Sequence, residues 1–358
     1  MSIKNKYIGI LLIATAMLLS ACSSDNPEAQ TVTTVNEPVG KEVQLMSYAS
    51  PFTDQELSHR AAPAGFTAYK PDKTTKMGVY MLLSENPETD WASPEEGRIT
   101  YNTSTEKWNA YFEVTADNTY TVYGYMPKTG EMSSSLAKST ADAATLTINN
   151  IKPVTTDDIC IITGVKDTDD GLKEGLFSWY TPVGVKTYKI SLLMDHLYAA
   201  AQFRLKIDAE YASLRTIKLK TMTLNTNIGS VDATVSLTHN TTGASPITGS
   251  ITYSLSGTNG AAEIFSSEEG TALNKTTPLI INAYFAPELS SNLTLVSTYD
   301  VYDSKGNLIR QDCTATNKLP NLEAIRGQRV LLYMTVNPTY LYVLSDPDLD
   351  NPTIKIEN

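Results

Sequence analysis

Cys22 is the residue with the clearest chemical signature. Lys4 and Lys6 precede an apolar run that extends to Leu19, and the letters LSAC close it at Cys22. A basic start, a short apolar core and small residues before a cysteine are typical of a bacterial lipoprotein signal, in which the cysteine thiol is acylated. We therefore expect residues 1–21 to be a signal peptide and Cys22 to carry lipid. The alternative is an ordinary cysteine in a cleaved secretory signal.

Arg60 lies in an exposed setting downstream of this cysteine. Its surroundings, SHRAAPAGF, are rich in Ser, Ala, Pro and Gly, which favours an exposed loop over a packed element. No other arginine occurs between Cys22 and Arg98. The alternative is an ordinary surface arginine. Upstream, residues 23–40 are polar and contain proline, which predicts a flexible tether, and the alternation in KEVQLMSYA at residues 41–49 favours a strand.

No pattern in the sequence predicts catalysis. The histidines are His59, His196 and His239, and none has the His-x-x-x-His spacing of a metal site. The chain also lacks a Cys-x-x-Cys pair, a nucleophile elbow and a phosphate-binding loop. We interpret His196 as a structural hydrogen-bonding residue. The sequence therefore predicts neither an enzyme nor a cofactor.

One acidic string near the C-terminus has the spacing of a calcium-binding EF-hand loop. Its acidic residues are Asp346, Asp348, Asp350 and Glu357. Asn351 replaces the glycine that such a loop requires, two prolines intrude, and no helical pattern flanks the string. We therefore expect no metal site here.

Composition favours a globular β protein and argues against nucleic acid as a partner. The formal net charge is -11, and no cluster of Lys and Arg offers a face for phosphate. The 358 residues predict about two domains. The 20 tyrosines, with abundant Thr and Val, favour strands. Besides Cys22 the chain has Cys160 and Cys313, which we expect to be free, partly buried thiols.

Short strands between turn signals make up residues 61–190. MGVYMLL, RITYN, WNAYFEV and TYTVYGYMP are followed by ATLTIN and DICIITG, and no long segment has helical spacing. This spacing predicts an antiparallel sandwich or barrel. Aromatic residues alternate along these strands and are expected to fill its core, with a carbohydrate-stacking platform as the alternative: Trp108, Tyr111, Tyr120, Tyr123 and Tyr125.

A second sandwich is expected over residues 191–358. AQFRLKID alternates as a half-buried strand does, and AEYASLR predicts a turn or a single helical coil. In TIKLKTMTLNT the apolar phase changes, so we expect a β-bulge near Lys220 and Thr221. RVLLYMTV and TYLYVLS are apolar on both faces, which is typical of a strand in the centre of a sheet or against a second molecule.

The order of these strings resembles the fimbrillin family of Bacteroidetes, the pilins of type V pili. The resemblance rests on MGVYMLL, RITYN followed by Trp108, TVYGYMP and MDHLYAAAQFRLKID, together with the lipobox, spacer and arginine at the N-terminus. It implies a fold of two antiparallel, transthyretin-like β-sandwich domains in tandem. Residues 22–60 would form a tether and a removable strand, followed by domains at 61–190 and 191–358.

The resemblance also implies a mechanism. In that family a lipoprotein precursor reaches the outer membrane, an arginine-specific protease removes the first strand, and the C-terminal strand of another subunit fills the groove. Carried over here, the cut falls between Arg60 and Ala61, and residues 41–49 are removed. The donor candidates are Tyr340, Leu341, Tyr342, Val343, Leu344, Ile354 and Ile356.

The implied partners are other copies of the chain and related pilins, the protease, and the outer membrane before maturation. The implied location is the outer membrane and then the fimbrium. The alternative is a surface lipoprotein that stays monomeric, as a pilus anchor or a glycan-binding protein. That alternative predicts no cut and a C-terminal strand folded back into its own sheet.

Overall fold

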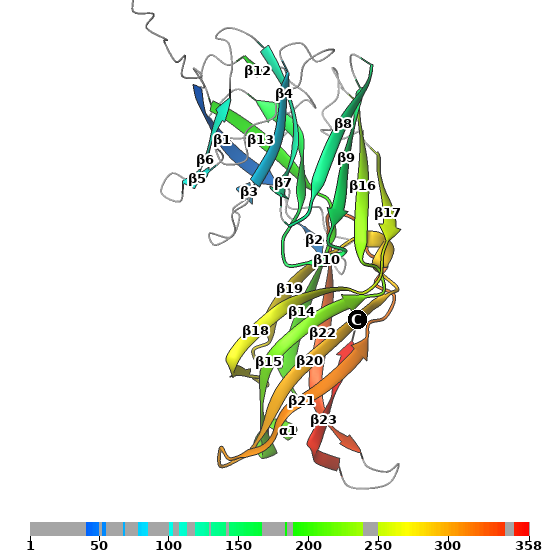
Figure 1. Ribbon diagram of the computed structural model, residues 1–358. Coiled ribbons are helices and arrows are strands. Elements are labelled where there is room, and N and C mark those ends of the chain that lie inside the picture. The colour runs from blue at the N-terminus through cyan, green and yellow to red at the C-terminus, as the bar shows by residue number, and fades with distance from the viewer. Residues whose placement is uncertain are drawn as a thin grey trace, which may run out of the picture. The chain divides into compact units, whose positions relative to one another are not determined.

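The computed structural model describes residues 41–49, 52–54, 67–68, 78–84, 100–102, 107–112, 119–128, 130–140, 143–166, 183–184, 189–238, 250–340 and 347–357. Within these ranges, regular structure is almost entirely β-strand (Figure 1). The exceptions are helix α1 (Tyr211–Leu214) and the 3-10 turn η3 (Pro287–Leu289). The all-β prediction is confirmed. None of the described helices is long and apolar enough to cross a membrane.

The largest sheet contains strands from the N-terminal half of the chain. Its order is β12-β7-β11-β13-β1-β6-β5, with β3 beside β1 and β4 beside β7. Its members are β1 (Lys41–Ala49), β3 (Thr67–Ala68), β4 (Gly78–Ser84), β5 (Thr100–Asn102), β6 (Lys107–Phe112), β7 (Thr119–Lys128), β11 (Cys160–Lys166), β12 (Val183–Gly184) and β13 (Lys189–His196). We call it the N-terminal sheet.

A second sheet has the order β10-β19-β14-β22-β2, with β23 also beside β22. Its members are β2 (Thr53–Asp54), β10 (Val154–Thr155), β14 (Ala199–Ile207), β19 (Leu279–Phe285), β22 (Gln328–Tyr340) and β23 (Pro347–Glu357). We call it the C-terminal sheet. The first described strand, β1, and the last, β23, thus belong to different sheets. In the C-terminal sheet, β2 and β23 both pair with β22.

Two four-stranded sheets complete the fold. One has the order β18-β15-β20-β21 and the other β17-β16-β9-β8. Their strands are β8 (Ser133–Thr140), β9 (Ala143–Ile151), β15 (Arg215–Thr226), β16 (Ser230–Thr238), β17 (Ser250–Ser256), β18 (Gly260–Ala272), β20 (Leu293–Asp303) and β21 (Leu308–Lys318). We call the first of these the facing sheet, because its buried side chains share one hydrophobic cluster with those of the C-terminal sheet.

Local patterns in the second half of the chain are confirmed. Phe203, Leu205 and Ile207 are buried, as their alternation predicts. The expected bulge is present at Lys220: the register of β15 against both neighbours shifts between Leu219 and Thr221. This extra residue lets apolar side chains on both sides of the bulge enter the same core.

The turn chemistry and the thiols are also as expected. Gly306 has φ 84° in the hairpin between β20 and β21, and Asp303 Oδ1 accepts hydrogen bonds from the amides of Lys305 and Asn307. Glycine adopts that dihedral without a steric penalty. Cys160 is buried and Cys313 half-buried, and neither forms a disulfide.

Most pairs of the described strands are antiparallel, as expected, and three are parallel. β1 runs parallel to β13, and β22 runs parallel to both β14 and β2. Sequence alternation specifies a half-buried strand but not the direction of its partner, so these three parallel pairs could not be identified from the sequence. The described residues beyond position 40 form one compact unit, and its hydrophobic cluster contains residues from either side of position 190. The division at 190 and 191 remains a prediction.

Candidate functional site

The N-terminal strand β1 has partners on both edges. Residues Gln44 to Ala49 pair in parallel with β13, and residues Lys41 to Leu45 pair antiparallel with β6. β3 continues the second edge at Tyr48 and Ala49. Because both edges of β1 are occupied, its removal would leave unpaired N–H and C=O groups on β13 and on β6. The prediction of a strand at residues 41–49 is confirmed, and it lies inside a sheet.

The residues after β1 continue into the C-terminal sheet. The ring of Phe52 stacks on His196, with ring centroids 3.7 Å apart and an interplanar angle of 26°. β2 pairs in parallel with β22 at Gln328 and Arg329, and Arg329 Nε donates to Asp54 Oδ1 at 2.5 Å. The segment upstream of Arg60 therefore connects two sheets.

Sequence reasoning missed the contacts of Phe52 and Asp54. The letters PFTD carry no periodic signal, and Asp54 meets its partner 275 residues further along the chain. No local sequence signal identifies these contacts. Several predicted site residues lie outside the described residues, namely Cys22, Arg60, Ala61, Leu341, Tyr342, Val343 and Leu344.

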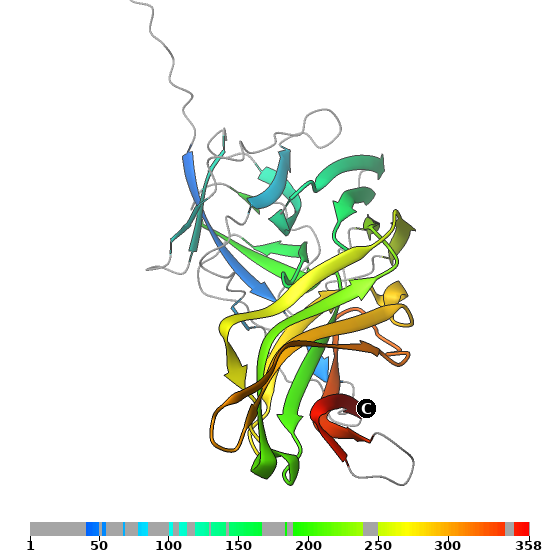
Figure 2. The same ribbon diagram turned by 60° about the horizontal axis from the view of Figure 1, so that its bottom comes forward.

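The C-terminal strand β23 lies in its own sheet. Residues Tyr333 to Tyr340 of β22 pair antiparallel with β23, which is red in Figure 2. Tyr340 is the last residue of β22, opposite Pro347. Ile354 is buried in the core, and Ile356 packs against it half-buried. The donor candidates Ile354 and Ile356 are therefore already paired and packed within their own chain.

Side chains of the facing sheet and of α1 also bind the backbone of β23. Tyr211 Oη donates to the carbonyl oxygen of Leu349 at 2.6 Å, and Tyr299 Oη donates to that of Pro352 at 3.1 Å. Asn317 Nδ2 donates to the carbonyl oxygen of Ile354 at 2.9 Å. These bonds hold β23 independently of the β22 ladder. Release of this strand would break both sets of contacts.

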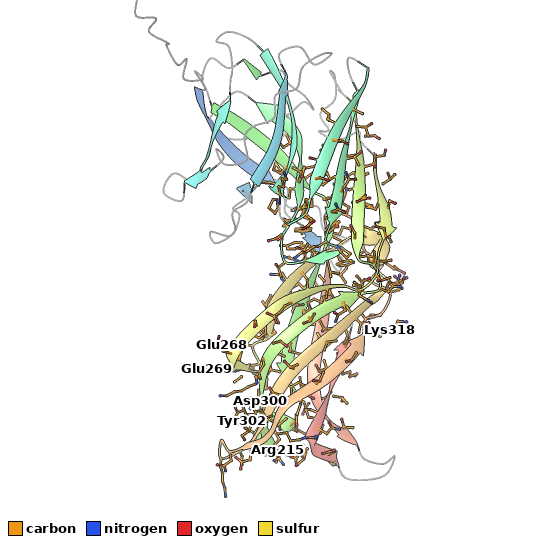
Figure 3. All side chains as sticks on the ribbon, viewed as in Figure 1. Arg215, Glu268, Glu269, Asp300, Tyr302 and Lys318 are labelled. Carbon is orange, nitrogen blue, oxygen red and sulfur yellow. The ribbon has the colours of Figure 1, made fainter. Side chains whose placement is uncertain are left out.

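An ion pair fixes the start of β23. Arg215, labelled in Figure 3, donates from Nη2 and Nε to Asp350 Oδ1 at 2.8 Å and 3.0 Å. Asp348 and Asp350 belong to a strand, and the carboxylate of Asp350 is already paired with a guanidinium. An EF-hand loop instead wraps its carboxylates around one ion. The acidic string therefore has a structural role within the described residues.

Alkaline pH provides a test of the Tyr299 contact. Burial raises the pKa of Tyr299 to about 12 from its ordinary value of 10.0. The folded chain therefore keeps this proton where the unfolded chain has lost it, so the stabilisation is complete below pH 10 and is lost as the pH rises through about 12. We expect the free energy of unfolding to fall over this window, and to fall less steeply in Tyr299→Phe.

Urea titrations at several pH values measure both slopes. At neutral pH the Tyr299→Phe chain should be less stable by about 1–3 kcal/mol, because the buried carbonyl of Pro352 loses its donor. Equal alkaline slopes in the two chains would show that the Tyr299 proton is not held by the fold.

Comparison with known proteins gives matches only among solved structures. No family model matches the sequence, and no curated protein matches it. A candidate cell adhesion protein from Bacteroides fragilis NCTC 9343 has a TM-score of 0.39 at 10% identity, over 89% of this chain and 97% of that one.

A fimbrial protein from Bacteroides vulgatus ATCC 8482 has a TM-score of 0.31 at 13% identity, over 87% and 98% of the two chains. The fimbrial anchor protein Mfa2 from Porphyromonas gingivalis has a TM-score of 0.25 at 9% identity, over 87% and 97%. These neighbours are described as fimbrial or cell adhesion proteins. Their TM-scores are below 0.5, so we base the proposed function on residues of this chain.

Proposed function

We propose that this chain is a structural pilin, exported as a lipoprotein and polymerised by strand exchange after proteolysis at Arg60. The observation that carries the proposal is the position of β1 between β13 and β6, upstream of the lone arginine of this region. A cut after Arg60 would separate β1 and β2 from the rest of the chain. The lipid on Cys22 would leave with them, which frees the subunit from the outer membrane.

Loss of β1 would leave an open position in the sheet, and a replacement strand that fills it is strongly favoured energetically. Each backbone hydrogen bond that a new strand restores contributes roughly 1 kcal/mol net. Each large apolar side chain that it buries contributes a further 1.5–3 kcal/mol or so. Several such contacts make a join that rarely opens. A second copy of the chain, or a related pilin, would supply the strand.

The donor in this proposal is the C-terminal segment, from Tyr340 to Leu344 or through Ile354 and Ile356. In the single chain β23 is paired with β22 and bound by Tyr211, Tyr299 and Asn317. Exchange must therefore release β23 before or while it enters the groove of another subunit. This requirement predicts that assembly is slow. It also predicts that the donor strand is held in the fibre as firmly as β23 is held in the precursor.

A second candidate is a surface lipoprotein that does not polymerise, acting as a pilus anchor or a glycan-binding protein. The pairing of β23 with β22 of the same chain favours this second candidate, because a subunit that donates no strand keeps its last strand in its own sheet. Such a protein would also keep β1 and the lipid on Cys22.

The N-terminal residue of the surface-assembled protein distinguishes the two candidates. Fibres are sheared from cells, and the mass of the N-terminal peptide is measured. The pilin proposal expects a peptide that begins at Ala61. Assembled chains that begin at a lipidated Cys22 would overturn the proposal and leave the anchor or glycan-binding role.

A further inference from the structure

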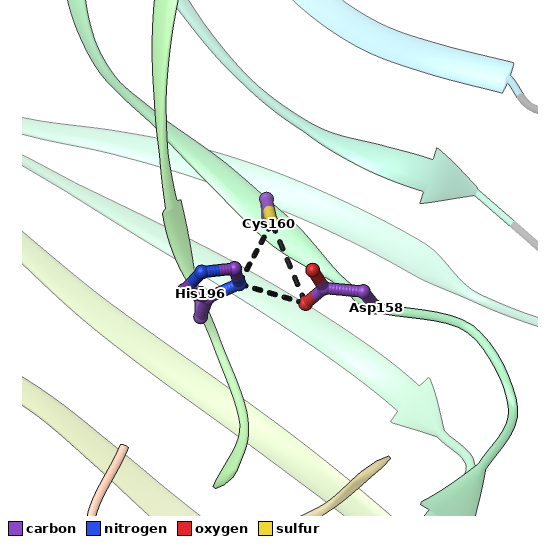
Figure 4. A group of neighbouring side chains, drawn as sticks. All are labelled: Asp158, Cys160 and His196. Atoms are coloured by element: carbon purple, nitrogen blue, oxygen red, sulfur yellow. Dashed lines mark hydrogen bonds and ion pairs between the residues drawn. The ribbon is translucent and has the colours of Figure 1, made fainter. Parts of the chain in front are cut away.

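Three side chains with metal-binding atoms meet at the start of β11 and the end of β13. Asp158, Cys160 and His196 are the only such group among the described residues, and their ligand atoms all lie within 4.8 Å of one another (Figure 4). His196 Nδ1 is 2.9 Å from Asp158 Oδ1 and 3.5 Å from Cys160 Sγ. The distance from Cys160 Sγ to Asp158 Oδ1 is 3.6 Å.

Sheet geometry explains how these residues come together. Cys160 and His196 are direct register partners across the antiparallel strands β11 and β13, so their side chains project from the same face. Asp158 lies two positions before Cys160, just outside β11, and its carboxylate reaches the same side of the sheet, where it contacts both other side chains. The amide of Leu197 donates to the carbonyl oxygen of Ile159 at 2.7 Å, which extends the pairing past the site.

The three separations are close to those of a tetrahedral zinc site. With Zn–S near 2.3 Å and Zn–N and Zn–O near 2.1 Å, tetrahedral angles place sulfur about 3.6 Å from nitrogen or oxygen, and nitrogen about 3.4 Å from oxygen. Both contacts of the sulfur already have this length. Only the Asp158–His196 separation must widen, by about half an ångström, which a small carboxylate rotation supplies.

The surroundings suit a thiophilic cation. Cys160 is fully buried, the side chain of His196 is 5% exposed and that of Asp158 is 15% exposed. Phe52 covers the His196 ring and also lies 5.6 Å from the ring of Tyr284. A carboxylate, an imidazole and a thiol that are mostly shielded from solvent form a mixed O/N/S donor set. Such a set selects zinc-like ions over calcium or magnesium, which prefer oxygen alone.

From this geometry we propose that Asp158, Cys160 and His196 bind a thiophilic divalent cation of the Zn²⁺ type. The imidazole binds through Nδ1, the carboxylate through Oδ1, and the thiol loses its proton to solvent as the metal–sulfur bond forms. A water molecule from the Asp158 side completes the four ligands. The ion joins β11 to β13, the strand that β1 pairs with, and so stiffens one wall of the β1 position.

The test uses the full chain with Cys22→Ser and Cys313→Ser, which leaves Cys160 as its only thiol. Equilibrium dialysis against Zn²⁺ should give one ion per chain. With Co²⁺ the chain should show a thiolate-to-cobalt charge-transfer band in the near ultraviolet. It should also show visible absorption bands with the intensity typical of tetrahedral Co²⁺. Cys160→Ser should remove the charge-transfer band, and His196→Gln should weaken Zn²⁺ binding by more than about tenfold.

Matched controls separate a lost ligand from a damaged fold. Asp158→Asn keeps the thiol, so the cobalt band should persist while Zn²⁺ affinity falls, whereas Asp157→Asn on the neighbouring residue should change neither. Far-ultraviolet circular dichroism of each variant checks that the strands are intact. Lack of stoichiometric Zn²⁺ binding by the folded chain, or an unchanged cobalt band in Cys160→Ser, would overturn the proposal. The measurement uses uncut, unassembled chain, so its outcome is independent of the pilin proposal.

Discussion

We expect fibre assembly to stop when β23 is joined to β22 by an engineered disulfide. Thr335 and Lys355 are register partners on the solvent side of this strand pair, opposite the buried Val336 and Ile354. Register partners of antiparallel strands have Cα atoms about 5 Å apart, which suits a disulfide. Thr335→Cys with Lys355→Cys should therefore lock β23 in place. If β23 must leave its sheet to enter another subunit, the locked chain cannot polymerise.

The control for this variant uses the same residue types in a hairpin that exchange leaves alone. Thr294 of β20 and Lys318 of β21 are also register partners, and Thr294→Cys with Lys318→Cys should assemble normally. Both chains carry Cys313→Ser, and mass spectrometry verifies each bond. Reductant should restore assembly of the locked chain. Normal assembly with the β22–β23 bond intact would rule out β23 as the donor.

Arg60→Ala should leave the precursor uncut and prevent polymerisation. An arginine-specific protease needs the guanidinium, and without the cut β1 stays between β13 and β6, where a donor would have to enter. Fibre yield is measured by electron microscopy and by the laddering of unheated samples on gels. The uncut chain should still carry its lipid and stay in the membrane fraction.

Two further substitutions make the Arg60 result specific. Arg60→Lys keeps the positive charge but should also prevent the cut, which separates protease recognition from charge. Arg98→Ala alters the next arginine of the chain and should leave assembly unchanged. Normal fibres from the Arg60→Ala chain would remove this residue from the mechanism.

Local features of the fold could be predicted because they depend on neighbouring residues. The alternation around Phe203 fixes which side chains enter the core, and the change of phase after Leu219 locates the bulge at Lys220. The parallel pairing of β1 with β13 could not be predicted. It joins Gln44 to Lys189, and no local pattern records which distant strand is chosen or in which direction it runs.

The same limit applies to the sites. Strand formation at residues 41–49 follows from their alternation, whereas the anchoring of Asp54 by Arg329 depends on the pairing of β2 with β22, which lie 275 residues apart in the chain. Asp158 and Cys160 are only two positions apart in the sequence, so two of the ligands are close in the chain itself. The third ligand, His196, is identified only by the register between β11 and β13.

A cryo-electron-microscopy map of the assembled fibre tests the central claim most directly. The measurement identifies the segment that lies between β13 and β6 of each subunit. We expect side-chain density there for the C-terminal segment of a neighbouring copy, within residues 340–357, and a subunit that begins at Ala61. Density for residues 41–49 of the same chain in that position, with β23 still paired to β22, would contradict the account.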